Sequence, residues 1–273
     1  MSAAPDILLR ISEHRRQRIP ELPEVPADLT EGEPIGPADN PFLAALSGGR
    51  HGTPATPATP ATPAIIAEVK MGSPRLGSLH GMVDPVAQAR SYAENGAAAL
   101  SVVVEPDFFH GGYDLLATCK EASGLPAIAK DFVVDPVQLL WARDAGADAV
   151  LLIAALHEAA ELCRYARLAR GLGLVPLIET HDAGDLAKLL GEPWEIVGVN
   201  NRDLRTFEVD LQRSISLLPS LPRGAVRVAE SGIHNVFDLL MLRDSGFDAF
   251  LIGEALLLAP DPGAKLREFT GRA

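Results

Sequence analysis

The stretch Gly146-Ala-Asp-Ala-Val150 decides the fold, because it ends one predicted helix and begins a predicted strand. The same pattern recurs as Gly96-Ala-Ala-Ala-Leu100 and as Gly246-Phe-Asp-Ala-Phe250. The first two copies are 50 residues apart and the last two are 100 apart, which equals two and four units of 25 residues. Glycine is a common residue where a helix stops. The spacing therefore predicts a chain built from repeated helix–strand units.

Eight short apolar runs follow one another from Ile65 onward. Continuous runs of Val, Ile and Leu are typical of parallel strands that are buried on both faces. Asp84-Pro85 and Asp135-Pro136, each an N-cap residue before proline, predict helix starts between the runs. Eight consecutive βα units favour a closed (βα)8 TIM barrel, and no glycine-rich dinucleotide motif supports an open sheet. The predicted strands are residues 65–69, 98–104, 126–130, 148–153, 174–179, 195–199, 226–230 and 248–252.

The first 64 residues differ from the rest of the chain. Apolar residues at positions 7, 8, 11 and 19 predict a short amphipathic helix. Asn40-Pro41 predicts the start of a second helix over Phe42–Ser47. Residues 53–64 are four copies of Thr-Pro-Ala, which indicate an extended linker. We therefore expect an N-terminal helical extension with a proline-rich linker over residues 1–64 and a barrel catalytic domain over residues 65–273.

The charge composition of the chain indicates which classes of partner it can bind. Acidic residues outnumber basic residues 36 to 24, which gives a formal net charge of −12. This charge repels phosphate backbones and anionic lipid, so neither nucleic acid nor membrane is expected as a partner. The longest apolar runs are too short to span a bilayer. Cys119 and Cys163 fall in predicted helices and fit small core residues in a reducing compartment, so a cytoplasmic location is expected.

Polar and charged residues gather where the predicted strands end. Buried strands rarely tolerate a lone charge, which costs several kcal/mol. Side chains two apart on a strand share a face, so Glu68 and Lys70 are expected to point into one cavity. A salt-bridge network that closes the barrel is the structural alternative, but the number of charges favours catalysis. The residues at these strand ends are Glu68, Lys70, Lys130, Glu179, Asn200, Arg202 and Glu230.

A phosphate site is predicted at the same end of the barrel. The loops after the last two strands of such barrels often bind phosphate through backbone N–H groups. Ser231-Gly232 and Gly253 occupy these loops, and Arg202 and Ser73 could add side-chain donors. The seven histidines show no metal-ligand spacing, so no metal site is expected, although His181 lies two residues after Glu179.

These residues together resemble the indole-3-glycerol phosphate synthase family over about residues 65–270. The loop after the first strand departs from the usual family pattern Ser-Pro-Ser-Lys-Gly, because here it reads Ser73-Pro-Arg-Leu-Gly77. The matching motifs are Ile66-Ala-Glu-Val-Lys70, Ser73-Pro74, Phe109 with Gly111, Ala129-Lys-Asp-Phe132, Ile178-Glu179, Val197-Gly-Val-Asn-Asn-Arg-Asp-Leu204, Ala229-Glu-Ser-Gly-Ile233 and Leu251-Ile-Gly-Glu254.

The resemblance implies a phosphorylated small-molecule substrate, 1-(2-carboxyphenylamino)-1-deoxyribulose 5-phosphate. Its conversion to indole-3-glycerol phosphate, CO2 and water belongs to tryptophan biosynthesis, so other enzymes of that pathway are candidate partners. We expect Lys130 to protonate the substrate ketone, because an ammonium that is partly desolvated becomes a better acid. Lys70 is expected to pair with the substrate carboxylate and to assist loss of the hydroxyl, and the division of roles between the two lysines stays open. Glu179 is the expected general base.

The remaining residues are expected to bind and orient. Asn200 would fix the reacting hydroxyl, while Glu68 and Glu230 would hold the lysines and the sugar hydroxyls. Protonation alone supplies the electrophile, so no cofactor or metal is expected. Phe109 and Phe132 would form apolar walls for the aromatic ring. The phosphate would be held by Ser73, Arg202, Ser231, Gly232 and Gly253.

Two other functions remain open from the sequence. Another phosphosugar barrel enzyme, such as phosphoribosylanthranilate isomerase, would share the phosphate loops, but it needs only one acid–base pair. A catalytically weak homologue could act as a binding or scaffolding subunit, and the altered loop Gly72–Leu76 is its only support. Measurable turnover would separate this subunit from an enzyme.

Overall fold

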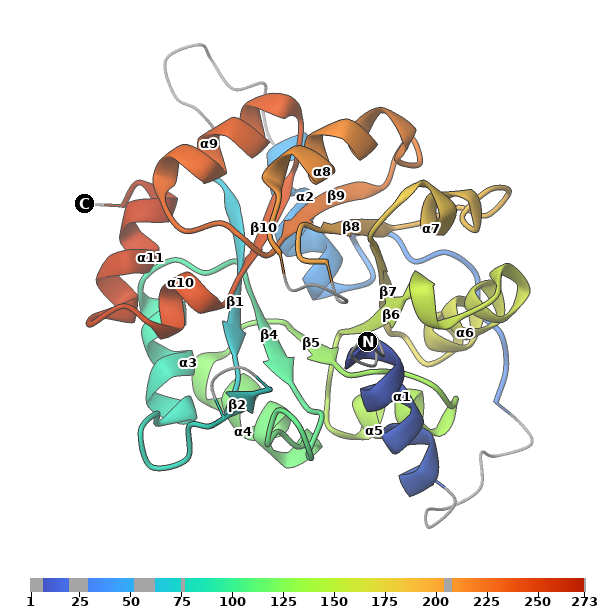
Figure 1. Cartoon of the computed structure of the whole chain (residues 1–273), viewed down its shortest axis with the longest axis horizontal. Helices are drawn as coiled ribbons and strands as arrows, with labels where there is room; N and C mark the ends of the chain where they lie inside the picture. The colour runs from blue at the N-terminus through green and yellow to red at the C-terminus, as the bar shows by residue number, and fades with distance from the viewer. Residues whose placement is uncertain (1–6, 20–28, 52–61, 75–76, 204–207, 273) are drawn as a thin grey trace, which may run out of the picture.

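Eight parallel strands close into a barrel in the order β1-β10-β9-β8-β7-β6-β5-β4 (Figure 1). The structure, a computed structural model, describes residues 7–19, 29–51, 62–74, 77–203 and 208–272. Each strand lies within one residue of its predicted bounds, so the predicted TIM barrel is confirmed. The strands are β1 (Ala64–Val69), β4 (Ala99–Val103), β5 (Ala127–Lys130), β6 (Ala149–Ile153), β7 (Val175–Thr180), β8 (Ile196–Asn200), β9 (Val226–Glu230) and β10 (Ala249–Ile252).

Helices alternate with the strands and form an outer ring. Asp84 caps α3 as predicted, since its carboxylate accepts hydrogen bonds of 3.0 Å from the backbone N–H groups of Val86 and Ala87. Gly96, Gly146 and Gly246 have φ values of 95°, 79° and 120°, in the left-handed region that helix ends need. The helices are α3 (Pro85–Glu94), α4 (Tyr113–Ser123), α5 (Val137–Asp144), α6 (Ala159–Gly171), α7 (Ala183–Ala187), α8 (Leu211–Leu217), α9 (Val236–Ser245), α10 (Glu254–Leu257) and α11 (Pro262–Thr270).

Two local details differ from the sequence prediction. The helix expected at Pro136 begins one residue later, at Val137, although Asp135 still accepts a 2.9 Å hydrogen bond from the Val137 N–H. A short hairpin of β2 (Gly72–Ser73) and β3 (Gly77–Ser78) follows β1 and was not expected. The longest described helix, α6, has 13 residues, and none in the described part of the chain could cross a membrane.

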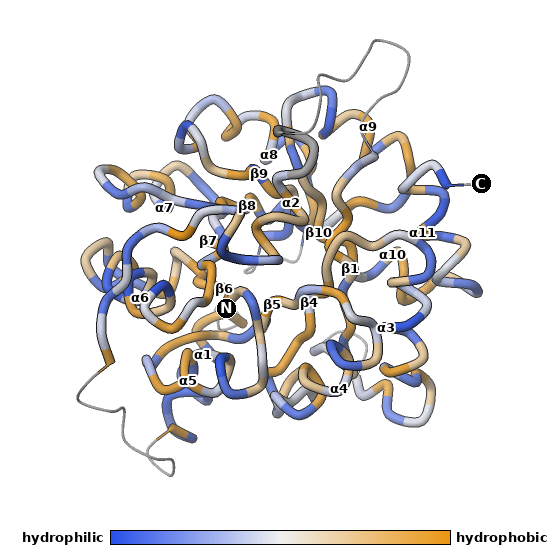
Figure 2. The backbone as a smooth tube through the Cα atoms, turned by 180° about the vertical axis from the view of Figure 1, so that it is seen from behind, coloured by the Kyte–Doolittle hydropathy of each residue, from blue (hydrophilic) through white to orange (hydrophobic). Residues whose placement is uncertain are grey.

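The apolar core has two parts. One lies between the strands and the outer helices and includes Tyr92, Leu139 and Phe250, which are fully buried. The other fills the barrel and includes Ile66 and Ile128. Figure 2 shows hydrophobic residues along the strands and mixed hydropathy on the surrounding helices, as burial on both faces of the strands requires.

The N-terminal helix α2 (Pro41–His51) closes the amino end of the barrel and lies across the middle of the strands in Figure 1. Phe42, Leu43 and Leu46 are buried in the inner core cluster. The predicted N-cap is confirmed, because the Asn40 Oδ1 accepts hydrogen bonds of 3.0 Å from the N–H groups of Phe42 and Leu43. Its Nδ2 also donates to the carbonyl of Asp148, just before β6. Most of the Thr-Pro-Ala repeat lies outside the described residues.

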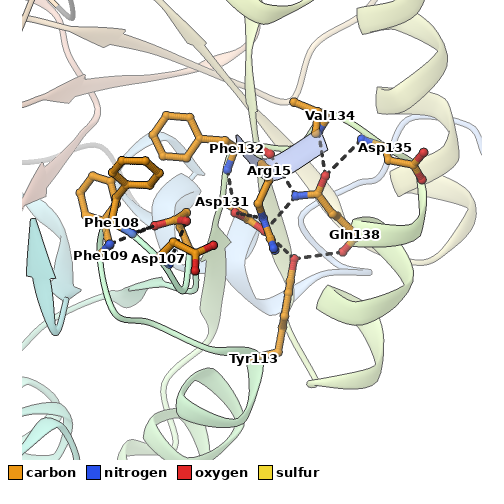
Figure 3. A network of polar contacts seen from close by, with 11 residues as sticks. Arg15, Asp107, Phe108, Phe109, Tyr113, Asp131, Phe132, Val134, Asp135 and Gln138 are labelled. Carbon is orange, nitrogen blue, oxygen red and sulfur yellow. Dashed lines mark hydrogen bonds and ion pairs between the residues drawn. The ribbon is translucent and has the colours of Figure 1, made fainter. Parts of the chain in front are cut away.

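The other N-terminal helix, α1 (Ile7–Arg18), confirms the predicted amphipathic helix and is fixed to the carboxyl end of the barrel. The Arg15 guanidinium binds the Asp131 carboxylate through Nη2–Oδ2 and Nε–Oδ1 distances of 2.6 and 3.2 Å, and both side chains are buried (Figure 3). Nearby, Arg18 pairs with Asp107 in the loop after β4 at 2.6 Å. These charge pairs place α1 over the loops that follow β4 and β5.

We predict that Arg15→Ala lowers the free energy of unfolding by about 3 kcal/mol, because it leaves a buried carboxylate without its cation. Arg16→Ala is the matched control, since Arg16 is an exposed neighbour that reaches Glu13 only at 3.8 Å. Its loss should be below about 1 kcal/mol. Urea unfolding of both variants measures the difference, and equal losses would contradict the structural role of the buried pair.

Candidate active site

A cavity of about 180 Å³ opens at the carboxyl ends of the strands. Twelve of the thirteen residues that the sequence predicted as site residues line it, and Glu230 does not. The twelve come from seven different βα segments, so the barrel topology alone brings them together. They are Glu68, Lys70, Ser73, Phe109, Lys130, Phe132, Glu179, Asn200, Arg202, Ser231, Gly232 and Gly253.

Two lysines share one carboxylate at the centre of this cavity. The Glu68 Oε1 lies 2.7 Å from the Lys70 Nζ, and its Oε2 lies 3.8 Å from the Lys130 Nζ. Burial raises the pKa of Glu68. The positive charges of Lys70 and then Lys130 lower it by a larger amount, so the pKa of Glu68 lies below its ordinary value. Glu68 is therefore ionised and holds both ammonium groups in the cavity.

The protonation of Lys130 corrects one expectation from the sequence. Burial does lower the pKa of Lys130, as we expected, but the charges of Glu68 and then Glu179 raise it by more. Its net pKa lies above the ordinary value, and its Nζ lies 4.0 Å from the Glu179 Oε2. Desolvation therefore does not make Lys130 a stronger acid in the substrate-free cavity. The ammonium is instead held as a proton donor throughout the neutral range.

Glu230 lies at the end of β9, paired with Asn200 of β8. Burial, followed by the charge of Glu179, raises its pKa well above the usual range. A hydrogen bond with the Glu179 side chain raises it as well. Glu230 is thus a buried, neutral carboxyl group beside the cavity rather than part of its wall.

Two glycines make room for these carboxylates. A Cβ atom on Gly198 of β8 would lie 2.1 Å from the Glu230 Oε1. A Cβ atom on Gly253, directly after β10, would lie 2.2 Å from the Glu68 Oε1. Both separations are far below van der Waals contact. We expected Gly253 at a phosphate site, and the structure adds that it provides the space in which Glu68 reaches the lysines.

The loops predicted to bind phosphate border the same cavity. Ser231 and Gly232 have φ values of 65° and 78°, and a left-handed non-glycine residue is uncommon outside functional sites. The Asn201 Nδ2 donates hydrogen bonds of 3.1 Å to the carbonyls of Glu230 and Ser231, which fixes this loop. Arg202 reaches across to Glu254, with an Nη2–Oε2 distance of 3.1 Å. These residues bring a guanidinium and strained backbone to one side of the cavity.

Two buried carboxylates position the aromatic wall (Figure 3). The rings of Phe109 and Phe132 lie 6.0 Å apart. Glu105 accepts hydrogen bonds from the N–H groups of Asp107, Phe108 and Phe109 at 3.0, 2.7 and 2.9 Å. Asp131 accepts one from the Phe132 N–H at 2.9 Å, in addition to its contact with Arg15.

The sequence prediction missed the two carboxylates that support the aromatic wall and some of the apolar residues that line the cavity. Glu105 and Asp131 were not predicted as site residues. Ile7, Leu8 and Ile11 of α1 also line the cavity, and the apolar spacing that predicted the helix was the only signal for them. Arg75 and Leu76, the family departure after Lys70, lie outside the described residues. Over the described ranges, no three His, Cys, Asp or Glu side chains are grouped so that they could hold a metal ion.

The family model for indole-3-glycerol phosphate synthase matches residues 8–269. The chain belongs to this family. An indole-3-glycerol phosphate synthase of an Azoarcus species is 41% identical over 271 residues, which cover 97% of this chain and 99% of the relative. One from Albidiferax ferrireducens is 42% identical over 233 residues, which cover 85% of each chain. The family match includes α1 as well as the barrel.

Solved structures with low identity share the barrel. The 3-hexulose-6-phosphate synthase of Salmonella typhimurium has a TM-score of 0.62 at 14% identity, covering 77% of this chain and 97% of that chain. The thiamine phosphate pyrophosphorylase of Pyrococcus furiosus has a TM-score of 0.57 at 14% identity, covering 77% and 95% of the two chains. At this identity the likeness shows the fold alone.

We predict that Glu230→Gln makes this member of the indole-3-glycerol phosphate synthase family more stable at neutral pH. The raised pKa means that folded Glu230 keeps a proton that the unfolded chain releases above about pH 4.3. Wild-type stability therefore falls as pH rises from there toward the folded pKa, and glutamine removes this loss. Urea unfolding should show a gain of about 1–2 kcal/mol at pH 7.5 and little gain at pH 4.5.

Glu94→Gln is the control for this prediction, because Glu94 is exposed. It should change stability by less than about 0.5 kcal/mol at both pH values. A gain from Glu230→Gln that is the same at both pH values would contradict a neutral Glu230 in the folded protein.

Proposed function

We propose that the chain closes the indole ring of 1-(2-carboxyphenylamino)-1-deoxyribulose 5-phosphate, releasing CO2 and water to give indole-3-glycerol phosphate. The observation that carries the proposal is the cluster in which Glu68 holds Lys70 and Lys130 while Lys130 also faces Glu179. Two ammonium donors and a carboxylate base in one cavity meet the needs of this reaction. The family membership supports the same conclusion.

The first step forms a carbon–carbon bond. The ring carbon that bears the carboxylate attacks the substrate ketone, and the ketone oxygen must gain a proton as its π electrons move onto it. Lys130 is the proposed donor, because the carboxylates of Glu68 and Glu179 keep it protonated. The proton transfer is favoured by the rising basicity of the substrate oxygen rather than by a weakened ammonium.

The next steps remove CO2 and water. The ring carboxylate leaves as CO2, and its bonding electrons restore the aromatic ring. Lys70, held by Glu68 at 2.7 Å, would pair with this carboxylate and then assist departure of the hydroxyl. Glu179 would accept the proton that is lost when the hydroxyl leaves as water. Asn200 would orient that hydroxyl; its Oδ1 is already held by the Arg202 N–H at 3.0 Å.

Binding contacts would turn remote binding energy into orientation. The apolar wall of Phe109 and Phe132 fits the aromatic ring. The phosphate would lie against the Ser231-Gly232 loop and Gly253, with Arg202 exchanging Glu254 for phosphate oxygens. Ser73 would add a hydroxyl donor.

The wider setting of the activity is also a proposal. Residues 65–273 would form the catalytic domain, while the extension over residues 1–64 adds one cavity wall through α1. A cytoplasmic enzyme is supported by the free thiols of Cys119 and Cys163. Other enzymes of tryptophan biosynthesis are the proposed partners, because they make its substrate and use its product.

We predict that purified protein mixed with the substrate produces indole fluorescence without added metal. Lys130→Ala and Glu179→Gln should each lower kcat by about 10²–10⁴, the usual range for a positioned acid or base. Lys120→Ala is the control, because Lys120 pairs with Asp148 outside the cavity. A silent wild-type protein would favour a binding or scaffolding subunit, and normal turnover of Lys130→Ala would exclude Lys130 as the acid.

A further inference from the structure

A histidine stands directly behind the proposed base. The His181 Nε2 lies 3.3 Å from the Glu179 Oε1, and its Nδ1 lies 3.5 Å from the Asp185 Oδ2. The side chain is only 11% exposed. Neither ring nitrogen forms a well-aligned hydrogen bond within the described part of the chain. The contacts are therefore ion-pair contacts between one imidazole and two carboxylates.

His181 is separated from the substrate cavity. It does not line the cavity that holds Lys130 and Glu179, but a second cavity of about 420 Å³, and Leu8 lines both. Its place in the sequence explains the contact with Glu179, because His181 directly follows β7 and comes two residues after Glu179. The two oxygens of Glu179 consequently have different neighbours: Oε1 faces His181, and Oε2 faces Lys130.

We propose that His181 is a positioning residue, an imidazolium between Asp185 and Glu179 that fixes the Glu179 carboxylate for catalysis. This inference rests on the proposed role of Glu179 as the general base. The Glu179 side chain is only 2% exposed, so a cation in contact with it compensates its buried charge. A cation in contact with Oε1 leaves Oε2 directed toward Lys130.

The charges around His181 support the imidazolium. Burial lowers the pKa of His181, but contact with Asp185 and the charges of Glu179 and Asp185 raise it above its ordinary value, against the opposing charge of Arg213 on α8. Asp185 shows the reciprocal effect, since His181 brings its pKa below normal despite burial. The Lys188 Nζ also lies 3.5 Å from the Asp185 Oδ1. The other charged residues on the second cavity are Asp182 and Asp203.

The first test is the pH profile of His181→Gln. Removing a cation beside a carboxylate makes that carboxylate easier to protonate, so the acid limb of the kcat profile should move up by about one pH unit. At pH 7.5 kcat should fall about tenfold through lost orientation. KM should stay within about twofold, because His181 does not line the substrate cavity. Asp185→Asn should move the limb in the same direction by less.

His157→Gln is the matched control. His157 is also buried and also pairs with a carboxylate four residues later, at 3.1 Å from the Glu161 Oε2, but it lines neither cavity. It should leave kcat and the acid limb unchanged. A His181→Gln enzyme with wild-type kcat and an unmoved limb would overturn the proposal. Equal kcat losses in both variants without a shift of the limb would do so as well.

A second measurement does not need the variant to fold. Nitrogen chemical shifts of the His181 ring, assigned through its backbone amide in the wild-type chain, report its charge directly. Both ring nitrogens should carry protons at pH 7, and a neutral ring at a pH where the enzyme turns over would overturn the proposal. Failure of the proposed function would show separately, as a wild-type protein without indole fluorescence.

Discussion

The site depends on the shared contact of Glu68 with Lys70 and Lys130. Buried charges are tolerated only when opposite charges compensate them at close range. One ionised carboxylate between two ammonium groups meets this condition at the barrel mouth, and it requires Gly253 to leave the space that Glu68 fills. Burial and then the charge of Glu179 raise the pKa of Glu230 well above its ordinary value, so it stays neutral. The protonation states of the cavity thus follow from one crowded set of charges.

Support for this cluster comes from side chains that hold the backbone or other side chains of the site in place. Glu105 and Asp131 hold the backbone of the aromatic wall, while Asn201 holds the Ser231 loop. His181 holds the outer oxygen of Glu179. Each is a buried polar group aimed at backbone or at another side chain. The residues of a site built on loops are held in position by such hydrogen bonds and ion pairs from neighbouring side chains rather than by the loop backbone itself.

Much of this could be predicted from the sequence. The eight strands were readable because each is a short continuous apolar run, and the strand-end residues followed from where those runs stop. The neutral state of Glu230 and the raised pKa of Lys130 could not be predicted from the sequence, since both depend on ionisable groups at the ends of four separate strands. Local pattern also could not show that Arg15 finds Asp131, 116 residues away. Local sequence patterns predict helices and strands, whereas interactions between charges that lie far apart in the sequence can be derived only once the fold is known.

The docking of α1 has a consequence for synthesis. During translation this helix is made before the barrel, yet Asp107 and Asp131, which bind it, follow 89 and 116 residues later. Ile11 cannot be buried against the cavity until about half of the chain exists, and β1 closes the barrel only when β10 arrives. Contacts of such high sequence separation slow folding. The nascent chain therefore carries the exposed apolar face of an amphipathic helix until about half of the chain exists, and the pocket for substrate is among the last parts of the molecule to form.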